Sequence, residues 1–563
     1  MIAIREKNTQ AKPLSFAVLR DVLVYGAGLA GAQAAVALAE RGHTVTLAFP
    51  EAEPLADETA RMAQFLDAAG IDGETGRLDA LRQSILRSPQ IVLKPGSEVA
   101  AFQGEMGAFR VSLRAQGALS ECEVGAVLLA CGDAVALPEA DLPVAAPRGQ
   151  TLLSLLPELA GKEALPPRLA FMLDLNAEQG RLVTILALAA ARQARLRGCE
   201  CVRIYCRNVR TGGTLIESLY RAARSVGVEF LRYARPPRCQ VSDAGIAVSA
   251  EDTQLGRAVE EVFDRVVFAD LVPSPRNRRL AELARLRQTP DRRGFLDNVW
   301  LLPCESSRRG IFLAGAWGAS TDFNELATEA AAASHSIHAL LHKGRIEMPD
   351  DAARVESEKC VACLTCVRLC PHSAIEFSLA DEAASISSRM CRRCGVCAAE
   401  CPADAIRFPN YDREDIAART GQHPRVTCFA CTNSATDAAA AARAQGLLDG
   451  IDLQIVEVPC AGTVDPRDVL KAFERGAERV LVLSCNPESC HYLDGATRAQ
   501  RRIARIRELM QSAGIDANRL FWGSLTAAET RRLAAFITGR TFSYSLTAGA
   551  AGRAAATAAL PVA

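Results

Sequence analysis

Thirteen of the 20 cysteines in this 563-residue chain lie between residues 360 and 490, where their spacing is that of metal ligands. Two runs, at residues 360–371 and 391–402, share the pattern C-x2-C-x2-C-x3-C-P. In such a run the first three cysteines hold three corners of an iron–sulfur cube, and the fourth ligates the other cube. The pattern therefore predicts two [4Fe–4S] clusters, which pass single electrons and have no substrate pocket of their own.

Each run is expected to supply the fourth ligand of the other run's cluster. The ligands of the first cluster are Cys360, Cys363, Cys366 and Cys401, and those of the second are Cys391, Cys394, Cys397 and Cys370. The runs repeat at a constant offset of 31 residues, and both continue as C-P-x-x-A-I-x-F. Zinc would use pairs of C-x-x-C rather than two such triplets. The repeat predicts a bacterial 2[4Fe–4S] ferredoxin domain over residues 348–412.

Five further cysteines follow candidate strands of a small α/β domain at residues 420–542. Strands that alternate with helices imply a parallel sheet, whose carboxyl ends share one edge. Four thiolates at that edge suffice for an iron–sulfur cluster, most simply [2Fe–2S], and equally for tetrahedral zinc. We expect His491 to pack or hydrogen-bond beside the site. Which of the five is not a ligand stays open: Cys428, Cys431, Cys460, Cys485 and Cys490.

A glycine-rich turn near the N-terminus predicts a nucleotide site. An apolar strand at residues 21–25 leads directly into G-x-G-x-x-G, followed by an Ala-rich helix and a second strand at residues 44–48. Gly26 permits the tight turn, Gly28 lets the backbone approach a pyrophosphate, and Gly31 lets the helix pack on the strand. This context predicts a Rossmann-type domain that binds a nucleotide.

The acidic residue that normally holds the ribose is absent from the end of the second strand. Phe49 stands there, and Glu51 or Glu53 could substitute only if the loop turns back. Without such a substitute, the domain would be one that has lost its ligand. No glycine-rich loop follows Asp174, so direct NAD binding is not expected.

The first 347 residues are expected to form a two-dinucleotide-domain α/β flavoprotein with a second α/β subdomain inserted at about 166–265. An apolar strand near residue 312 ends in small residues and is followed by a helix from about residue 324. The remaining cysteines of this block are read as small buried hydrophobic residues. They are Cys122, Cys131, Cys199, Cys201, Cys206, Cys239 and Cys304.

Composition limits the remaining possibilities. Lys plus Arg and Asp plus Glu both number 65, which gives no support for nucleic-acid binding. No apolar run reaches the length of a membrane-spanning helix, and the N-terminus lacks a signal peptide's apolar stretch. We expect a cytoplasmic protein without a transmembrane segment, attached to membranes at most through partner subunits. Residues 547–563, rich in Ala and Gly, are expected to be disordered.

Two resemblances extend this interpretation. The stretches GIFLAGAWGASTD (310–322), RMAQ (61–64) and RTGGTLIESLY (210–220) resemble the flavin domain of the heterodisulfide reductase A subunit, with Phe49 as a departure. The C-terminal block resembles the delta subunit of methyl-viologen-reducing hydrogenase. That likeness rests on Cys428-x2-Cys431, Cys460-x-Gly462, Lys471-Ala472-Phe473 and Cys485-x-Pro487-x-x-Cys490-His491-Tyr492. The resemblances imply one FAD, with Gly315 and Asp322 among its binding residues, and they favour a [2Fe–2S] cluster over zinc.

The combination predicts an electron-transfer subunit of a multi-subunit oxidoreductase, with no catalytic residues of its own. The fusion is similar to the quinone-interacting oxidoreductase B subunit. It implies a partner dehydrogenase or hydrogenase on one side, and a ferredoxin, heterodisulfide-reductase-like or quinone-linked partner on the other. Two alternatives stay open: an iron–sulfur adaptor with a vestigial flavin site, and an NAD(P)H-dependent flavin oxidoreductase.

Overall fold

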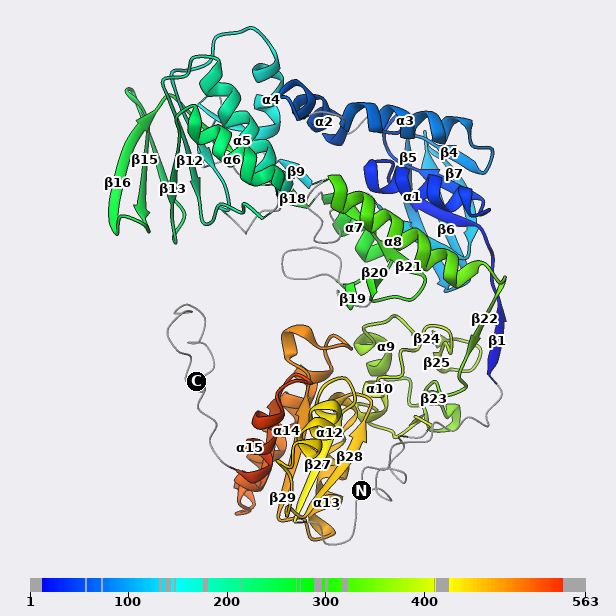
Figure 1. Ribbon diagram of the computed structural model, residues 1–563. Coiled ribbons are helices and arrows are strands. Elements are labelled where there is room, and N and C mark those ends of the chain that lie inside the picture. Colours follow the sequence, from blue (N-terminus) through cyan, green and yellow to red (C-terminus); the bar gives the residue numbers. More distant parts are fainter. Residues whose placement is uncertain are drawn as a thin grey trace. The chain divides into compact units, whose positions relative to one another are not determined.

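The computed structural model describes most of the chain as two compact units, each treated by itself below (Figure 1). The larger unit holds residues 12–350 with 371–374, and the smaller holds the others. Asp322, Cys131 and the tail from residue 547 lie outside the described residues. The described residues are 13–55, 58–71, 74–130, 134–136, 143–145, 148–175, 181–212, 214–269, 271–273, 275–287, 296–298, 302–315, 323–409, 411 and 425–539.

A seven-stranded sheet forms the first layer of the larger unit, in the order β19-β20-β21-β8-β2-β3-β4. The five strands from β21 to β4 are parallel, and β20 is antiparallel to β21 and to β19. Helices α1 (Leu29–Glu40), α3 (Glu74–Arg87) and α8 (Phe323–Leu341) contribute to its apolar core. The strands are β2 (Val22–Tyr25), β3 (Val45–Ala48), β4 (Ile91–Lys94), β8 (Ala126–Leu129), β19 (Leu296–Asn298), β20 (Leu302–Ser306) and β21 (Ile311–Leu313).

A second parallel sheet follows the order β10-β17-β11-β12-β13. It starts at residue 149, ahead of the start near 166 expected from sequence, because β10 pairs with β17. The α/β two-dinucleotide-domain class is thereby confirmed. The strands are β10 (Gly149–Thr151), β11 (Arg168–Met172), β12 (Cys201–Cys206), β13 (Val228–Arg232) and β17 (Arg265–Phe268), with helices α4 (Leu152–Ala160), α5 (Arg181–Leu196) and α6 (Thr214–Ser225).

Antiparallel elements complete the larger unit. Two three-stranded meanders, β5-β6-β7 and β14-β15-β16, and two strand pairs, β1-β22 and β9-β18, accompany helices α2 (Glu58–Ala68) and α7 (Pro275–Leu283). The strands are β1 (Leu14–Ala17), β5 (Ser97–Glu105), β6 (Ala108–Ala115), β7 (Ala118–Val124), β9 (Ala134–Ala136), β14 (Arg238–Ser242), β15 (Gly245–Asp252), β16 (Arg257–Phe263), β18 (Leu271–Pro273) and β22 (Arg345–Met348).

The ferredoxin domain carries its sequence repeat into the backbone. Left-handed residues occur in pairs 31 positions apart, at 362 and 393, at 364 and 395, and at 373 and 404. Such turns direct successive backbone N–H groups toward a common point, as an anionic cluster requires. The elements are β23 (Arg354–Val355) paired with β26 (Ile406–Arg407), β24 (Ile375–Ser378) paired with β25 (Ala383–Ile386), and helices α9 (Thr365–Leu369) and α10 (Val396–Ala399).

The C-terminal domain (residues 425–539) is a parallel sheet in the order β28-β27-β29-β30, with helices on both faces. Helices α13 and α14 cover one face, and α12 and α15 cover the other. The elements are β27 (Val426–Cys431), β28 (Leu453–Val458), β29 (Arg479–Ser484) and β30 (Leu520–Ser524), with α12 (Ala435–Ala444), α13 (Pro466–Glu474), α14 (Gly495–Ser512) and α15 (Thr530–Thr538).

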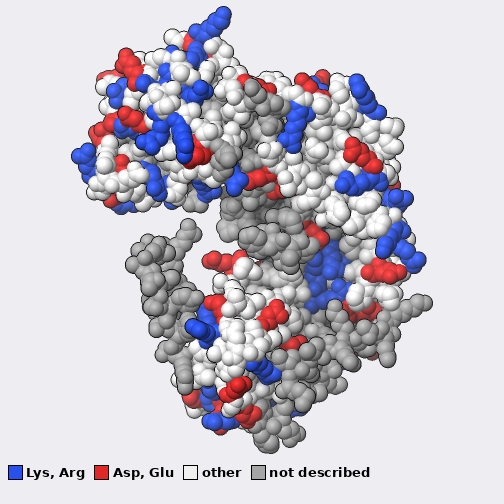
Figure 2. All heavy atoms as spheres, in the orientation of Figure 1, with Lys and Arg blue, Asp and Glu red and all other residues white. Residues whose placement is uncertain are grey.

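Charge and hydropathy of the described residues agree with the balanced composition. Basic and acidic side chains intermingle on the face drawn in Figure 2. Within the described ranges, every helix falls short of the length or the apolar character needed to cross a bilayer.

Candidate iron–sulfur and nucleotide sites

The four cysteines expected to bind the first cubane line one pocket in the ferredoxin domain. Cys360 and Cys363 come from the loop before α9, Cys366 lies in its first turn, and Cys401 comes from the second run. The backbone N–H of Ala405 donates to the Cys401 sulfur at 3.3 Å. A hydrogen bond from the Thr365 hydroxyl lowers the pKa of the exposed Cys363 thiol. Both contacts favour thiolates, the form that binds iron.

The thiols expected around the second cubane are more enclosed. Cys391, Cys394 and Cys397 are all buried, and the N–H of Arg393 donates to the Cys391 sulfur at 3.4 Å. Burial raises the pKa of Cys397 well above its ordinary value, and the neighbouring thiols of Cys391 and Cys370 raise it further. Thiols packed this closely cannot all ionise unless a cation joins them. The residues present therefore fit a second cluster.

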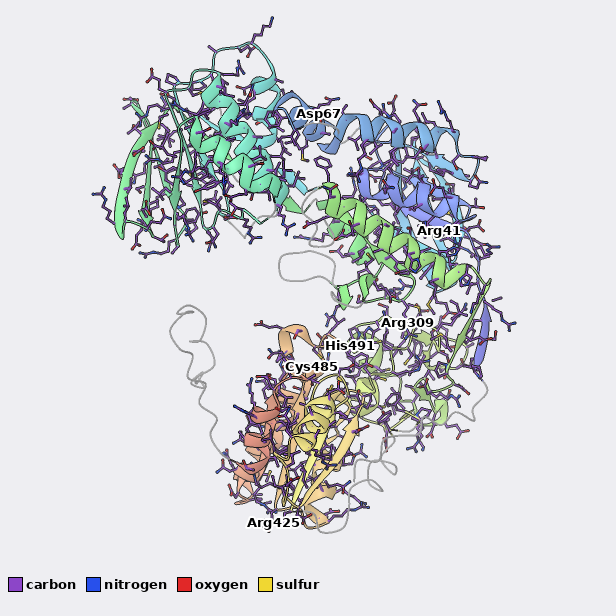
Figure 3. The ribbon with its side chains drawn as sticks, viewed as in Figure 1. Arg41, Asp67, Arg309, Arg425, Cys485 and His491 are labelled. Carbon is purple, nitrogen blue, oxygen red and sulfur yellow. The ribbon has the colours of Figure 1, made fainter. Side chains whose placement is uncertain are left out.

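Four cysteines converge in the C-terminal domain at the carboxyl edge of its sheet. We call Cys431, Cys460, Cys485 and Cys490 the C-terminal thiol site. The sulfur atoms of Cys431 and Cys485 lie 3.7 Å apart. The ideal β-carbon position at Gly495 lies 2.1 Å from the Cys460 sulfur and 3.7 Å from the Cys490 sulfur. Figure 3 shows Cys485 and His491 at one end of this domain and Arg425, which precedes β27, at the other.

Hydrogen bonds from backbone N–H groups and between thiols reach the sulfur atoms of this site. Backbone N–H groups of Gly462 and Ala496 donate to the sulfur atoms of Cys460 and Cys490, each at 3.4 Å. Hydrogen bonds from the thiols of Cys431 and Cys490 lower the pKa of Cys485. Hydrogen bonding to Cys485 raises the pKa of Cys431, and hydrogen bonding to Cys460 and Cys485 raises the pKa of Cys490. Within the described ranges, no three or more His, Cys, Asp or Glu side chains are grouped closely enough to hold a single metal ion.

Cys428 lies apart from the C-terminal thiol site. The sequence pattern predicted a strand that ends at residue 427, but β27 continues to Cys431. Side chains alternate between the two faces of a strand, so residues three apart point in opposite directions. Cys428 therefore packs in the core under α12 and α15, and burial alone raises the pKa of its thiol to about 12. Its expected position just past a strand end is corrected.

Three side chains around this site, Asn433, Tyr492 and Thr463, had no role assigned from the sequence, although Tyr492 belongs to the C-terminal family motif. The Asn433 amide donates to the Pro459 carbonyl at 3.1 Å and approaches the Cys431 sulfur at 4.0 Å. Burial raises the pKa of Tyr492, and the surrounding thiols raise it further. His491 packs edge-on against Tyr492, with 4.6 Å between ring centroids. Thr463, the third, lies between this site and the ferredoxin domain and is treated below.

The glycine-rich turn of the larger unit has the geometry of a phosphate-binding site. Gly26 adopts a φ of 109°, and Gly28 caps α1 without a side chain, leaving the helix N-terminus open to an anion. A β-carbon at Gly31 would lie 1.9 Å from the Gly26 carbonyl oxygen, so only glycine fits there. The cradle fits a dinucleotide pyrophosphate.

The loop after β3 does turn back, but its acids are engaged. The N–H of Leu55 donates to the Ala27 carbonyl at 2.9 Å, which returns the loop to the glycine turn. Glu51 pairs with Arg276 at 3.4 Å, and Glu53 pairs with Arg82 at 3.2 Å. Phe49 is buried in the apolar core. The two acidic side chains near the expected ribose position, Glu51 and Glu53, are therefore already paired with arginines.

The backbone N–H of Gly315 is held by the half-buried carboxyl group of Glu329. Its N–H donates to Glu329 on α8 at 2.9 Å, and its φ is 78°. Burial raises the pKa of Glu329 from 4.5 to about 7. Near neutral pH this carboxyl therefore exchanges a proton beneath the strand end where the sequence predicts flavin binding.

Replacing Glu329 by Gln should alter how stability depends on pH. With its folded pKa raised, Glu329 holds a proton that the unfolded chain releases, so stability falls as the pH rises from about 4.5 to about 7. Glu329→Gln removes this titration and keeps an oxygen for the Gly315 N–H. Melting temperatures of both proteins, measured from about pH 5 to about pH 8, should converge at the acidic end, with the variant more stable above pH 7. If the two curves of melting temperature against pH ran parallel, the raised pKa of Glu329 would be contradicted.

Comparisons with known proteins divide along the same boundaries. Residues 426–543 match the family "Methyl-viologen-reducing hydrogenase, delta subunit", and residues 352–402 match "4Fe-4S dicluster domain". The iron-sulfur D subunit of the F(420)-non-reducing hydrogenase vhc of Methanococcus voltae is 32% identical over 102 residues, which cover 18% of this chain and 69% of that protein.

A larger part of the chain is similar to a longer protein. The A subunit of the ferredoxin:CoB-CoM heterodisulfide reductase of Methanosarcina mazei is 30% identical over 345 residues, which cover 60% of this chain and 43% of the relative. The chain thus spans less than half the length of that relative. Among solved structures, thioredoxin reductase of Lactococcus lactis aligns over 57% of this chain and 99% of its own, at 16% identity and a TM-score of 0.42. That score is too low to support a functional argument.

Proposed function

Because the chain belongs, through residues 426–543, to the hydrogenase delta-subunit family, we propose that it is an electron-transfer subunit of a heterodisulfide-reductase-like oxidoreductase complex. Its own residues would hold two [4Fe–4S] clusters, one [2Fe–2S] cluster and one FAD. When bound, a flavin exchanges electron pairs and the clusters exchange single electrons. The chain's part is to fix these groups and to shield them from water.

One observation carries this proposal. Three sets of four cysteines, two in the ferredoxin domain and one in the C-terminal domain, gather within the smaller unit of the chain. Backbone N–H groups donate to sulfur atoms in all three sets. Such N–H···S bonds are a main means by which proteins adjust cluster potentials. An arrangement of this kind serves electron relay rather than substrate chemistry.

The partners follow from the relatives. One named relative is an iron-sulfur protein of a hydrogenase, and another is part of a heterodisulfide reductase that uses ferredoxin. We therefore propose a partner hydrogenase or dehydrogenase and, on the other side, a ferredoxin, heterodisulfide-reductase-like or quinone-linked partner. A cytoplasmic location is part of the proposal.

The experiment that tests the flavin is a measurement of released FAD and of iron per chain after anaerobic purification. We expect about one FAD per chain in the wild type and little in Gly31→Ala, because the added β-carbon meets the Gly26 carbonyl at 1.9 Å. Gly76→Ala is the matched control, since a β-carbon there has no atom within 4 Å.

Two outcomes would redirect the proposal. A wild type with a full complement of iron and no flavin would favour the iron–sulfur adaptor, an alternative that the arginine-paired Glu51 and the buried Phe49 support. Bleaching of the flavin by NADH without partner proteins would favour the NAD(P)H-dependent oxidoreductase instead.

A further inference from the structure

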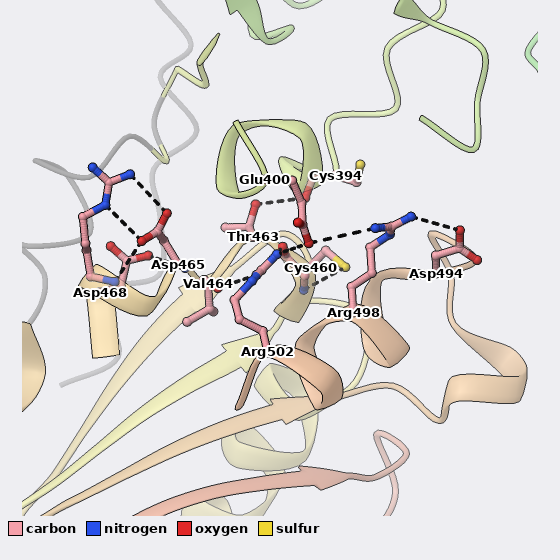
Figure 4. A network of polar contacts seen from close by, with 12 residues as sticks. Cys394, Glu400, Cys460, Thr463, Val464, Asp465, Asp468, Asp494, Arg498 and Arg502 are labelled. Atoms are coloured by element: carbon pink, nitrogen blue, oxygen red, sulfur yellow. Dashed lines mark hydrogen bonds and ion pairs between the residues drawn. The ribbon is translucent and has the colours of Figure 1, made fainter. Parts of the chain in front are cut away.

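The ferredoxin and C-terminal domains meet inside one compact unit, and the contact includes the second ferredoxin run and Asp404, which follows it. The turn at Ala461–Thr463, which directly follows Cys460, packs against α10. Thr463 is buried there and donates its hydroxyl to the Cys394 carbonyl at 3.1 Å (Figure 4). A ligand residue of each proposed cluster therefore takes part in the contact.

The two ferredoxin runs differ where this contact forms. Leu364 and Gly395 occupy equivalent left-handed positions, with φ values of 58° and 72°. A β-carbon at Gly395 would lie 1.9 Å from the Thr463 hydroxyl oxygen. Across the contact, a β-carbon at Gly462 would lie 2.9 Å from Val396 Cγ2. Both glycines permit a backbone approach that side chains would prevent, and the first run, with Leu364, lacks this adaptation.

Charged side chains fix the same contact from its edge. Arg502 on α14 donates to the carbonyls of Gly462 and Val464, at 3.1 and 2.6 Å, and to Glu400 at 2.5 Å. Arg498 approaches the same carboxylate at 4.0 Å. Glu400 directly precedes Cys401, and the Arg502 side chain is only 10% exposed. Charge-assisted hydrogen bonds of this kind are stronger than neutral ones and help to fix the geometry of the contact.

A short covalent and hydrogen-bonded path thus joins two ligand residues. Cys460 bonds back to the turn through its sulfur, which accepts from the Gly462 N–H at 3.4 Å, and through its carbonyl, which accepts from the Thr463 N–H at 2.9 Å. The Thr463 hydroxyl then reaches the Cys394 carbonyl. Burial raises the pKa of Cys394, and the nearby thiols of Cys397 and Cys460 raise it further.

We propose that Thr463 is a positioning residue for electron transfer between the C-terminal thiol site and the second cubane site. This inference rests on the proposed function and adds which two sites exchange electrons and what holds them in register. One electron leaves the cluster at one site, which is oxidised, and enters the cluster at the other, which is reduced. No bond is made or broken and no proton is transferred.

The test compares variants of the full chain, purified anaerobically with clusters intact. Thr463→Val keeps the shape of the side chain and removes the hydroxyl, whereas Thr463→Ser keeps the hydroxyl. After rapid one-electron reduction, re-equilibration between the two sites should slow about tenfold in Thr463→Val, equal to about 1.4 kcal/mol in the barrier. Thr463→Ser should restore the wild-type rate. The electron paramagnetic resonance spectrum should show a weaker magnetic interaction between the two reduced sites in Thr463→Val alone.

Thr427→Val is the matched control. Thr427 is buried in β27 of the same domain, and its hydroxyl has no hydrogen-bond partner, so the same substitution removes no contact. Wild-type rates and spectra in Thr463→Val would overturn the proposal. If Thr463→Val loses iron, the second variant is Glu400→Gln, which loosens the same contact from its edge. A wild-type rate of electron re-equilibration in Glu400→Gln would also overturn the proposal. Absence of clusters from the wild type would instead contradict the proposed function.

Discussion

Replacing Cys460 by Ala should remove the cluster of the C-terminal domain, whereas Cys428→Ala should leave it in place. The Cys460 sulfur borders Gly495 with Cys490 and accepts a backbone N–H, so it faces the common space of the four thiols. Cys428 packs on the opposite face of β27. For a [2Fe–2S] site, we expect a loss of about two irons per chain in Cys460→Ala and none in Cys428→Ala.

The measurement is iron per chain together with the electron paramagnetic resonance spectrum of the dithionite-reduced protein. Both substitutions truncate a buried cysteine in the same domain, so they control for the small cavity that each creates. Loss of the signal in Cys428→Ala, with retention in Cys460→Ala, would reverse the assignment. If the C-terminal thiol site of the wild type released zinc rather than iron, its assignment as an iron–sulfur site would be wrong, and it would be a structural zinc site.

Replacing Cys366 by Ala should remove one cubane and stop electron delivery to a ferredoxin-type acceptor. Cys366 lines the same cavity as Cys360, Cys363 and Cys401, and a cubane with three remaining thiolates is lost or converted. The expected loss is about four irons per chain. Because Cys401 lines this cavity although it belongs to the second run, Cys401→Ala should remove the same spectral component as Cys366→Ala.

Cys206→Ala serves as the control for this pair. Cys206 is fully buried in β12 of the larger unit, and burial raises the pKa of its thiol to about 12, as for an inert core cysteine. We expect it to keep its iron and its electron flow. Unchanged iron content and flow in Cys366→Ala would contradict its assignment as a ligand. Loss of different components in Cys366→Ala and Cys401→Ala would contradict the exchange of ligands between the runs.

Sequence alone was sufficient where the chemistry is local. Three ligands of each cubane come from one short loop, and the Gly26–Gly31 turn joins a strand directly to its helix. In both cases neighbouring residues determine the geometry. The two-dinucleotide-domain class was predictable for the same reason, since strands that alternate with helices permit few arrangements of a parallel sheet.

Only the tertiary structure decided features that depend on distant segments. β27 runs through Cys431 because β28 and β29 pair with it from both sides, and that length turns Cys428 away from the other thiols. Glu51 is held by Arg276, some 225 positions away in sequence, so its availability to a ribose could not be predicted. The contact between Thr463 and Cys394 spans 69 residues. Residue spacing determined which side chains could bind clusters, whereas strand pairing and domain packing determined which of them face one another.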